Sequence, residues 1–351
     1  MIPAPEHLPD RGPATAAEMA ALWRQNRARL AEDHRASRVR ATGRPSHLKI
    51  ELTNFCNLAC PMCPHPQMRR EVGYMSEALF RRVIDQAAPE LEFAYLHHLG
   101  ESLLHPRLGA LIRYGRSRGA AMGLSTNATF LDERKAHALL ENGLEFLVLS
   151  IDGASAESYD TLRPGGDFQT TCAHVRALLE LRRQLGAATD VVVQMIATTI
   201  NRDEAARFAG EWRSAGAEVM IKEARNWAGQ VPLAQLALAP PPPPLSTPCK
   251  MPWTELTVLW DGAVVPCANF YERDGAIGDL STQTLDEVWN GPALAALRAA
   301  HLTDTVAAVP VCASCPRHSF DHHDFVATDQ LAQRRRAYLA RGDLTPRPGL
   351  S

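Results

Sequence analysis

Six short apolar runs alternate with helix-like stretches between His47 and Ala224, and this alternation limits the possible folds more than any other feature. The runs cover 47–54, 93–99, 121–127, 146–152, 191–198 and 218–224. The helix candidates, several ending in glycine, include 76–88, 106–119, 132–143, 168–186 and 202–216. Such a pattern predicts parallel strands joined by right-handed crossovers. It fits a partly closed (β/α)6 barrel or an open doubly wound sheet, with function at the carboxyl ends of the strands.

The flanking segments differ in composition from this α/β core. Residues 14–39 have helical composition, with a possible apolar stripe at Met19, Leu22, Leu30 and Ala31. Five prolines at 240–244 indicate a stiff linker. The next unit has a hairpin signal at Asp261-Gly262, followed by one predicted helix over 284–301. The charged tail is predicted to contain a helix near 330–340. We therefore predict five parts: 1–45 leader, 46–226 barrel, 227–248 linker, 249–318 small second domain, and 319–351 tail.

Composition sets limits on partners and compartment. The net charge of −2 over 351 residues argues against a broad surface for nucleic acid. The N-terminal segment lacks the continuous apolar core of a secretory signal, and no run approaches the roughly 18 apolar residues of a membrane span. Eight cysteines without an export signal indicate metal or redox chemistry rather than disulfides. We expect a cytoplasmic protein with reduced thiols and no membrane or nucleic-acid partner.

Three cysteines follow the first predicted strand at a distinctive spacing. The run TNFCNLACPMCP contains Cys56, Cys60 and Cys63. Three thiolates curled around one corner of a four-iron cluster leave one iron open to a small molecule. A zinc site with His65 as fourth ligand is the alternative, although C-x3-C-x2-C is unusual for zinc. Buried structural cysteines, the third possibility, need no such spacing.

This C-x3-C-x2-C motif after the first strand resembles the hallmark of the radical S-adenosylmethionine (SAM) superfamily. The resemblance covers about residues 48–223 and continues into the C-terminal unit. It implies a partial (β/α)6 barrel and a [4Fe-4S] cluster whose open iron binds the amino and carboxylate groups of SAM. Reductive cleavage then gives methionine and a 5′-deoxyadenosyl radical. The electron comes from an external one-electron reductant such as flavodoxin or ferredoxin.

Other polar residues correspond to family positions that contact SAM. The segment Leu99-Gly100-Glu101-Ser102 resembles the family's G-G-E-P, in which the carboxylate meets the SAM ammonium, although Leu99 and Ser102 depart from it. Met62 stands where the family often has an aromatic residue near adenine. The remaining expected SAM contacts lie at or after the third and fourth strands: Ser125, Asn127, Ser150, Asp152 and Arg163. Each of these also suits a strand-end cap or a turn.

A second cysteine set lies near the C-terminus. Cys249, Cys267, Cys312 and Cys315 could hold structural zinc or a fully ligated cluster, and their chemistry alone does not choose. Their context resembles the twitch unit, a shortened SPASM domain with one auxiliary [4Fe-4S] cluster. The spacing is close to that of 2-deoxy-scyllo-inosamine dehydrogenase, which oxidises an aminocyclitol. His318, His322 and His323 could replace a ligand or belong to a solvated tail.

These features predict a radical SAM oxidoreductase that oxidises a carbinol carbon of a sugar or aminocyclitol, as in aminoglycoside antibiotic assembly. The auxiliary cluster would accept the electron, and a base would come from His97, His98, Glu223 or Asp152. Cys172 could instead donate a hydrogen atom, which would make the enzyme a sugar epimerase, or be a core residue. Peptide modification is a further alternative, although the leader is short for a recognition domain. A zinc-binding adaptor without catalysis is the rival from another class.

Overall fold

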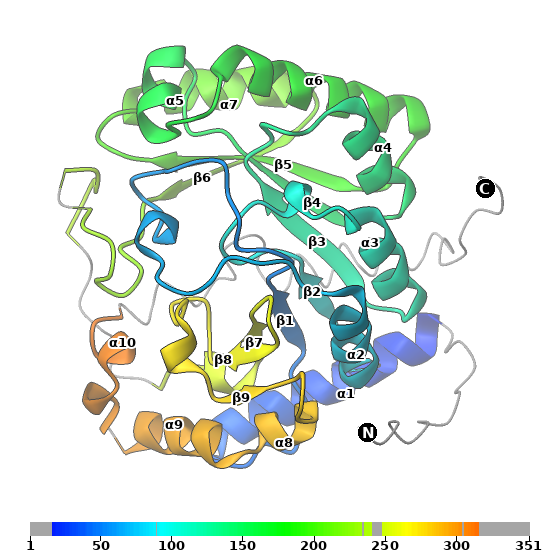
Figure 1. The fold of residues 1–351 in the computed structure, drawn as a ribbon, viewed down its shortest axis with the longest axis vertical. Helices are drawn as coiled ribbons and strands as arrows, with labels where there is room; N and C mark the ends of the chain where they lie inside the picture. Colours follow the sequence, from blue (N-terminus) through cyan, green and yellow to red (C-terminus); the bar gives the residue numbers. More distant parts are fainter. Residues whose placement is uncertain (1–15, 89, 234, 241–247, 304, 316–351) are drawn as a thin grey trace.

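A nine-stranded sheet forms the centre of the computed structural model, which describes residues 16–88, 90–233, 235–240, 248–303 and 305–315. The strand order is β6-β5-β4-β3-β2-β1-β7-β8-β9 (Figure 1). The first six strands are mutually parallel, which confirms the predicted partial barrel: β1 (His47–Ile50), β2 (Phe93–Tyr95), β3 (Ala121–Thr126), β4 (Phe146–Ser150), β5 (Asp190–Ala197) and β6 (Glu218–Glu223). In the described residues β6 and β9 are the two edges, so the barrel is not closed.

Helices cover the outer side of the parallel strands (Figure 1). Five match the sequence expectation: α2 (Glu77–Ala87), α3 (Leu108–Ser117), α4 (Glu133–Glu141), α6 (Phe168–Leu185) and α7 (Ala205–Ser214). The sequence did not predict the short α5 (Ala156–Leu162). Four of these helices start at a Ser or Asp whose side chain accepts from the third backbone N–H: Ser76, Asp132, Ser155 and Asp167. Four helices of the crossover connections therefore begin at residues whose side chains cap the helix.

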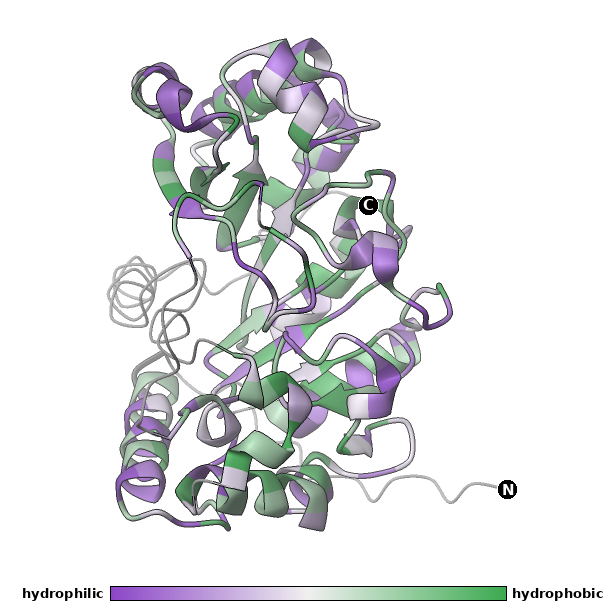
Figure 2. Ribbon diagram, turned by 90° about the vertical axis from the view of Figure 1, so that its left-hand side faces the viewer, coloured by the Kyte–Doolittle hydropathy of each residue, from purple (hydrophilic) through white to green (hydrophobic). Residues whose placement is uncertain are grey.

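The two faces of the sheet have different surroundings. Leu48, Ala94 and Leu147 belong to the large core between sheet and helices. Their strand neighbours point the other way and form a small apolar cluster that includes Phe93, Tyr95, Phe146, Val148 and Val192. We call this second side the inner face. Figure 2 shows the strands mostly in the colours of apolar residues. Nearer the carboxyl ends of the strands the inner face becomes polar, as described below.

The second unit joins the barrel sheet directly. β7 (Glu255–Val258) pairs in parallel with β1 and antiparallel with β8 (Ala263–Val265), which pairs with β9 (Gly278–Asp279). The hairpin signal is thus confirmed, and Gly262 adopts the positive φ of +98° that its turn requires. The single helix expected over 284–301 is wrong. It is divided into α8 (Leu285–Trp289) and α9 (Pro292–Leu302), because Pro292 disfavours helical geometry at Gly291, which is extended (φ −68°, ψ 164°). A last helix, α10, covers Pro310–Ala313.

The leader forms helix α1 (Ala16–Arg35) as predicted, but it buries a different stripe. Met19 and Leu30 are buried, whereas Ala31 is exposed. Asn26 and Asp33 complete the buried side and bind the backbone of 42–44. These bonds fix the chain just before β1. The tail helix expected near 330–340 lies outside the described residues. No described helix has the length and hydropathy needed to span a bilayer.

Candidate functional site

The three cysteines of the first motif lie in a loop that begins directly after β1. The Cys63 N–H donates to Cys60 O at 3.0 Å, which curls the loop so that the charges of the three thiols influence one another. Burial raises the pKa of Cys56 to about 11 and that of Cys63 to about 12, and it raises the pKa of Cys60 as well. A buried thiolate is costly alone, and iron coordination removes that cost. The donor set therefore fits a cluster.

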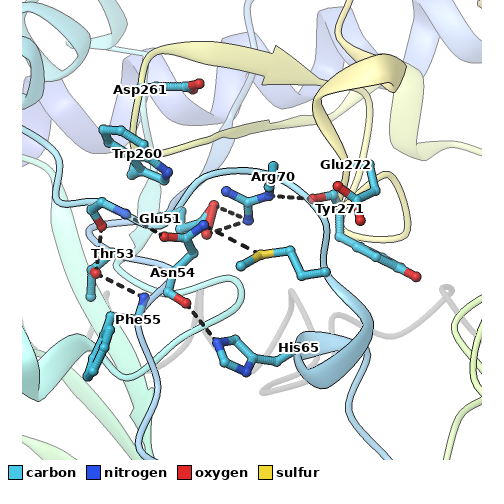
Figure 3. A network of polar contacts seen from close by, with 12 residues as sticks. Glu51, Thr53, Asn54, Phe55, His65, Arg70, Trp260, Asp261, Tyr271 and Glu272 are labelled. Carbon is cyan, nitrogen blue, oxygen red and sulfur yellow. Dashed lines mark hydrogen bonds and ion pairs between the residues drawn. The ribbon is translucent and has the colours of Figure 1, made fainter.

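Polar contacts from the end of β1 hold this loop in place (Figure 3). Asn54 accepts from Gly73 N at 2.9 Å and donates to Glu71 O at 2.8 Å. His65 Nε2 lies 2.8 Å from Asn54 O. A Cβ at Gly73 would come within 2.5 Å of the Trp260 ring, so only glycine fits this approach. His65, the alternative zinc ligand, thus has its Nε2 bound to the backbone.

A buried ion pair joins the loop to the second unit. Arg70 Nη2 contacts both carboxylate oxygens of Glu51, at 2.5 and 2.6 Å, and Arg70 Nε donates to Tyr271 O at 2.6 Å (Figure 3). The Glu51 side chain is fully buried. Burial raises the pKa of Glu51 to about 7, although Arg70 opposes the shift. The neighbouring Arg69 N–H donates to Glu272 at 2.8 Å. The cysteine loop is therefore held between β1 and residues 271–272.

Glu101 organises the strand ends around Cys56. Its carboxylate accepts from Leu103 N at 2.9 Å, Thr126 Oγ1 at 2.7 Å and Asn127 N at 2.7 Å. Burial raises its pKa, and the hydrogen bonds oppose that effect. Asn127 Nδ2 in turn lies 3.9 Å from Cys56 Sγ. The structure thus brings Glu101 and Asn127 together beside the first cysteine, and three of the carboxylate's acceptor positions are already used.

Ser125 and Ser150 lie side by side on the inner face. Their hydroxyl oxygens are 3.2 Å apart, and Gln194 Nε2 donates to Ser150 Oγ at 3.4 Å. The Ser125 N–H donates to His97 Nδ1 at 3.0 Å. Burial lowers the pKa of His97 to about 3, so its imidazole is neutral. These residues form a continuous polar band across β2 to β5.

Asp152 and Arg163 form a second buried ion pair. Arg163 Nε and Nη2 contact Asp152 Oδ2 at 2.8 and 2.6 Å, and Ile196 N donates to Asp152 Oδ1 at 2.7 Å. The Asp152 carboxylate is thus occupied, which disfavours it as a base. The Asp152 charge raises the pKa of Arg163 against the effect of burial. Arg163 in turn lowers the pKa of the motif cysteines, which places its charge beside them.

The second cysteine set is also brought together by the fold. Burial raises the pKa of Cys315, and the charges of the other three add to the shift: Cys249, Cys267 and Cys312. Asn269 Nδ2 donates to Cys315 Sγ at 3.4 Å. None of the eight cysteines, all of which lie in the described residues, forms a disulfide. Within the described residues, no three His, Cys, Asp or Glu side chains form the tight group that a single metal ion needs. His318, His322 and His323 lie outside those residues.

Charged residues on the inner face were missed by the sequence reasoning. Lys49 of β1 binds Glu255 of β7 at 2.6 Å, and the charges of both act on Cys267. Burial raises the pKa of that thiol to about 11. The signal was present: a lysine and a glutamate stand inside runs of otherwise apolar strand residues, where burial is costly without a partner. Both strands that lead to cysteine sets thus meet at this ion pair.

Several buried polar atoms of the strands and of the segments that follow them have no hydrogen-bond partner among the described residues. They are Arg70 Nη1, His98 Nε2, Gln194 Oε1 and Thr257 Oγ1. Gln194 and Thr257 stand on the inner face at the register positions beside Ser150 and Lys49. The charges of Arg70 and Lys49 act on His98, and burial lowers the pKa of His98 well below its ordinary value. Unsatisfied buried groups of this kind are rare and need an explanation.

Two predicted catalytic residues lie away from this region. Glu223 is exposed at the end of the edge strand β6. Cys172 lies in the core on the helix side of the sheet, opposite to the inner face. Burial raises its pKa to about 11, and the charged groups that act on it are Glu211, Arg176 and Asp167. The structure therefore supports the core interpretation of Cys172.

Comparison with known proteins gives independent information. Residues 50–209 match the family model of the radical SAM superfamily, and residues 249–316 match the SPASM iron–sulfur cluster-binding domain. The chain is 30% identical over 181 residues to a tungsten-containing aldehyde ferredoxin oxidoreductase cofactor-modifying protein of Pyrococcus furiosus, covering 50% of each chain. It is 28% identical over 285 residues to a PqqA peptide cyclase of Streptomyces rochei, covering 71% of this chain and 76% of that protein.

A solved structure shares the fold. The crystal structure of BtrN in complex with AdoMet and 2-DOIA aligns with a TM-score of 0.52 and 18% identity, over 76% of this chain and 91% of that one. At this identity the likeness concerns the fold alone. The two family models indicate that a [4Fe-4S] cluster, an auxiliary cluster and SAM are the cofactors. The chain therefore carries a radical SAM core over residues 50–209 and a C-terminal SPASM iron–sulfur cluster-binding region over residues 249–316.

Proposed function

We propose that the protein oxidises a carbinol carbon of a polyhydroxylated small molecule, of the sugar or aminocyclitol type, to a ketone. In this proposal Cys56, Cys60 and Cys63 hold the cluster that binds SAM. The auxiliary cluster is held by the second set, Cys249, Cys267, Cys312 and Cys315. With the clusters bound, the first cysteine set would hold the group that supplies the electron for SAM cleavage, and the second set the group that takes up the electron left on the oxidised substrate.

One observation carries the oxidative outcome: the strand that leads to the first cysteine set pairs with the strand that leads to Cys267 of the second set. The Lys49–Glu255 ion pair joins these two strands, β1 and β7, and its charges act on Cys267. A substrate bound at the inner face would thus lie beside both strands. Cys172, the hydrogen donor that an epimerase would need, lies on the opposite side of the sheet. The geometry therefore favours removal of an electron over return of a hydrogen atom.

The polar atoms beside and on the inner face favour a polyol as substrate. A ligand with several hydroxyl groups would both accept and donate hydrogen bonds, as Arg70 Nη1, Gln194 Oε1 and Thr257 Oγ1 require. A purely apolar ligand would leave them unsatisfied at a cost of about 1–3 kcal/mol each. An analogue without these hydroxyl groups would leave the same atoms without partners, so such a site discriminates strongly in favour of hydroxylated ligands.

We assign His98 as the base. Oxidation of a carbinol removes one hydrogen atom from carbon, then one proton from oxygen and one electron. His98 is neutral at pH 7 because burial lowers its pKa, and its Nε2 has no partner among the described residues, so this nitrogen is available for the proton. His97 is less suitable because its Nδ1 already accepts from Ser125 N.

SAM would be bound by the residues that converge on Cys56 and on Arg163. Asn127 and Glu101 lie beside the first cysteine, and the Arg163 guanidinium offers a cation for the methionine carboxylate. Asp152 then acts on SAM through Arg163 rather than by direct contact. Ser125 and Ser150 supply hydroxyls on the same side.

A second candidate is modification of a peptide. It is favoured by the match to the PqqA peptide cyclase, which covers 71% of this chain. Among the described residues the sheet ends at β6 and at β9, and a peptide could pair with such an edge strand. Our proposal of a polyol rests instead on the unsatisfied polar atoms of the inner face.

The test is an anaerobic assay of the protein reconstituted with iron and sulfide. SAM, dithionite and a panel of sugars, aminocyclitols and peptides are supplied, and 5′-deoxyadenosine and product mass are scored. A polyol that loses two mass units while 5′-deoxyadenosine forms in equal amount supports the proposal. A peptide product, or an inverted alcohol of unchanged mass, would refute it. The matched control is Cys172→Ala, which should leave the ketone yield unchanged.

A further inference from the structure

Asn269 is placed to bond two cysteines of the second set. Its side-chain Nδ2 donates to Cys315 Sγ at 3.4 Å, and its backbone hydrogen-bonds to the Cys267 thiol, which lowers the pKa of that thiol against the effect of burial. Asn269 is itself buried, with 4% of its surface accessible. A thiol is a weak acceptor, whereas a deprotonated sulfur that ligates iron accepts a hydrogen bond well. These two donors therefore fit a cluster held by the second set.

A strained turn fixes the peptide that carries Asn269. Gln230 Nε2 donates to Asn269 O at 2.9 Å and to Trp227 O at 2.7 Å. Trp227 and Ala228 have φ angles of +51° and +59°, which side-chain-bearing residues adopt rarely and only where surrounding contacts impose them. Here Trp227 Nε1 donates to Met62 O at 3.2 Å, which ties the turn to the first cysteine loop. Asn269 is therefore held at its carbonyl by a segment that is itself anchored.

Glu255 carries a buried negative charge opposite Cys267. Thr257 of β7 pairs with Val265 of β8 in antiparallel register, so that two residues further along each chain Glu255 stands opposite Cys267. The Glu255 carboxylate is fully buried and lies 2.6 Å from Lys49 Nζ. The charge of Glu255 raises the pKa of the Cys267 thiol, and that of Lys49 lowers it. The carboxylate therefore acts on the second set with little screening by salt.

We propose that Asn269 and Glu255 set the reduction potential of the cluster held by the second set, with Asn269 raising the potential and Glu255 lowering it. Reduction adds one negative charge to a cluster. A donor aimed at a ligating sulfur stabilises the added charge, whereas a buried carboxylate nearby destabilises it. Both residues act through the cluster and are positioning residues in the oxidation of the substrate.

The inference rests on the proposed function for what the potential achieves. In that function the substrate radical gives one proton from its hydroxyl group to His98, loses one electron and becomes a ketone, and the electron goes to the cluster of the second set. A higher potential favours this transfer, so Asn269 promotes oxidation of the substrate. Glu255 limits how tightly the electron is held, so that the electron can leave before the next turnover.

The test is a redox titration of the anaerobically reconstituted protein, followed by EPR spectroscopy without substrate. Titrations with and without SAM distinguish the two clusters, because only the cluster with an open iron binds SAM. Asn269→Leu removes the bond to Cys315 and keeps the backbone bond to Cys267. We expect this variant to lower the potential of the second cluster by about 59 mV, which is a tenfold change in a one-electron equilibrium. Glu255→Gln, which keeps an acceptor for Lys49, should raise that potential by a similar amount.

Two controls accompany the titrations. The potential of the first cluster should stay constant in both variants. Asn142→Leu should leave both potentials unchanged, because it removes a side-chain hydrogen bond to Ala138 O, at 2.7 Å, at the end of a helix that contains no cysteine. The proposal would be overturned by an unchanged second potential in Asn269→Leu, by shifts of the same sign in Asn269→Leu and Glu255→Gln, or by equal shifts in both clusters.

Iron content guards against a variant that fails to assemble. If Asn269→Leu retains about four irons instead of about eight, Asn269→Asp is titrated in its place, and its carboxylate should lower the second potential at least as much. Loss of the second cluster from both variants would also overturn the proposal, since Asn269 would then hold the cluster rather than set its potential. The titrations contain no substrate, so the expected shifts without ketone from any polyol would refute the proposed function alone.

Discussion

Replacing Arg70 with methionine removes the cation that faces Glu51 and keeps an apolar stem. Glu51 is fully buried, so its carboxylate would lose its partner without gaining water. Removing one member of a buried pair costs about 3–5 kcal/mol. The raised pKa of Glu51, about 7 against an ordinary 4.5, corresponds to about 3 kcal/mol between its charged and neutral forms. The Arg70→Met variant should therefore be strongly destabilised at pH 8.

The pH dependence has a definite sign. Because the folded pKa of Glu51 is raised, its contribution to stability is fully present below pH 4.5 and is lost as the pH rises through 7. Between pH 6 and 8 this group lowers the stability of the wild-type protein by about 1 kcal/mol. Without Arg70 the pKa rises further, and the loss over that range becomes about twice as large. The cost of the substitution should thus be larger at pH 8 than at pH 6.

The free energy lost in the Arg70→Met variant can be measured at pH 6 and pH 8 by urea unfolding. The reduced, cluster-free chain is used, and unfolding is followed by tryptophan fluorescence. Glu51→Leu/Arg70→Met should recover most of the loss, because two apolar side chains replace the pair. Arg183→Met is the control, since Arg183 and Glu180 are 73% and 49% exposed and their pair should contribute little. An equal cost at pH 6 and 8, or a cost no larger than that of Arg183→Met, would refute the reasoning.

Three further changes test other parts of the structure. Gly73→Ala should destabilise the protein by about 1–3 kcal/mol in urea, because the new Cβ meets Trp260 at 2.5 Å; Gly210→Ala, with nothing within 4 Å inside α7, should instead stabilise it. Cys267→Ala should lower the iron content from about eight to about four per chain and leave SAM cleavage with dithionite intact; loss of both clusters would contradict the division between the two sets. His98→Gln should slow product formation about 10²–10⁴-fold, as loss of a base does, while 5′-deoxyadenosine still forms; an unchanged product rate would exclude His98 as the base.

The sequence predicted the six parallel strands well because local signals and long-range packing agree there. The strands are short and most of them are largely apolar, and most of the following helices begin at a capping Ser or Asp, so the pattern defines the elements directly. The helix expected over 284–301 failed where apolar periodicity hid the backbone restriction at Gly291-Pro292. On α1, Asn26 and Asp33 are buried because they bind the backbone of 42–44, which no periodicity can foresee.

Part of the site could also be predicted, because residues close along the chain or at successive strand ends are brought together by the local pattern. Spacing along one loop groups Cys56, Cys60 and Cys63, and the chain order of strand ends places Glu101 and Asn127 near them. The Lys49–Glu255 pair joins residues more than 200 positions apart, so only the pairing of β1 with β7 reveals it. Asp152 looked like a contact to SAM, but its nearest partner in the fold is Arg163.

The parallel pairing of β1 with β7 also has a consequence for biosynthesis. β1 is among the first strands to leave the ribosome, yet one of its edges stays open until residue 258 has been made. An open apolar strand edge is a template for association with other chains. Such distant pairings also slow folding. We therefore expect chains truncated before β7 to aggregate rather than to form an independent barrel, and the fraction of soluble protein among nested C-terminal truncations should rise sharply only once residues 255–258 are included.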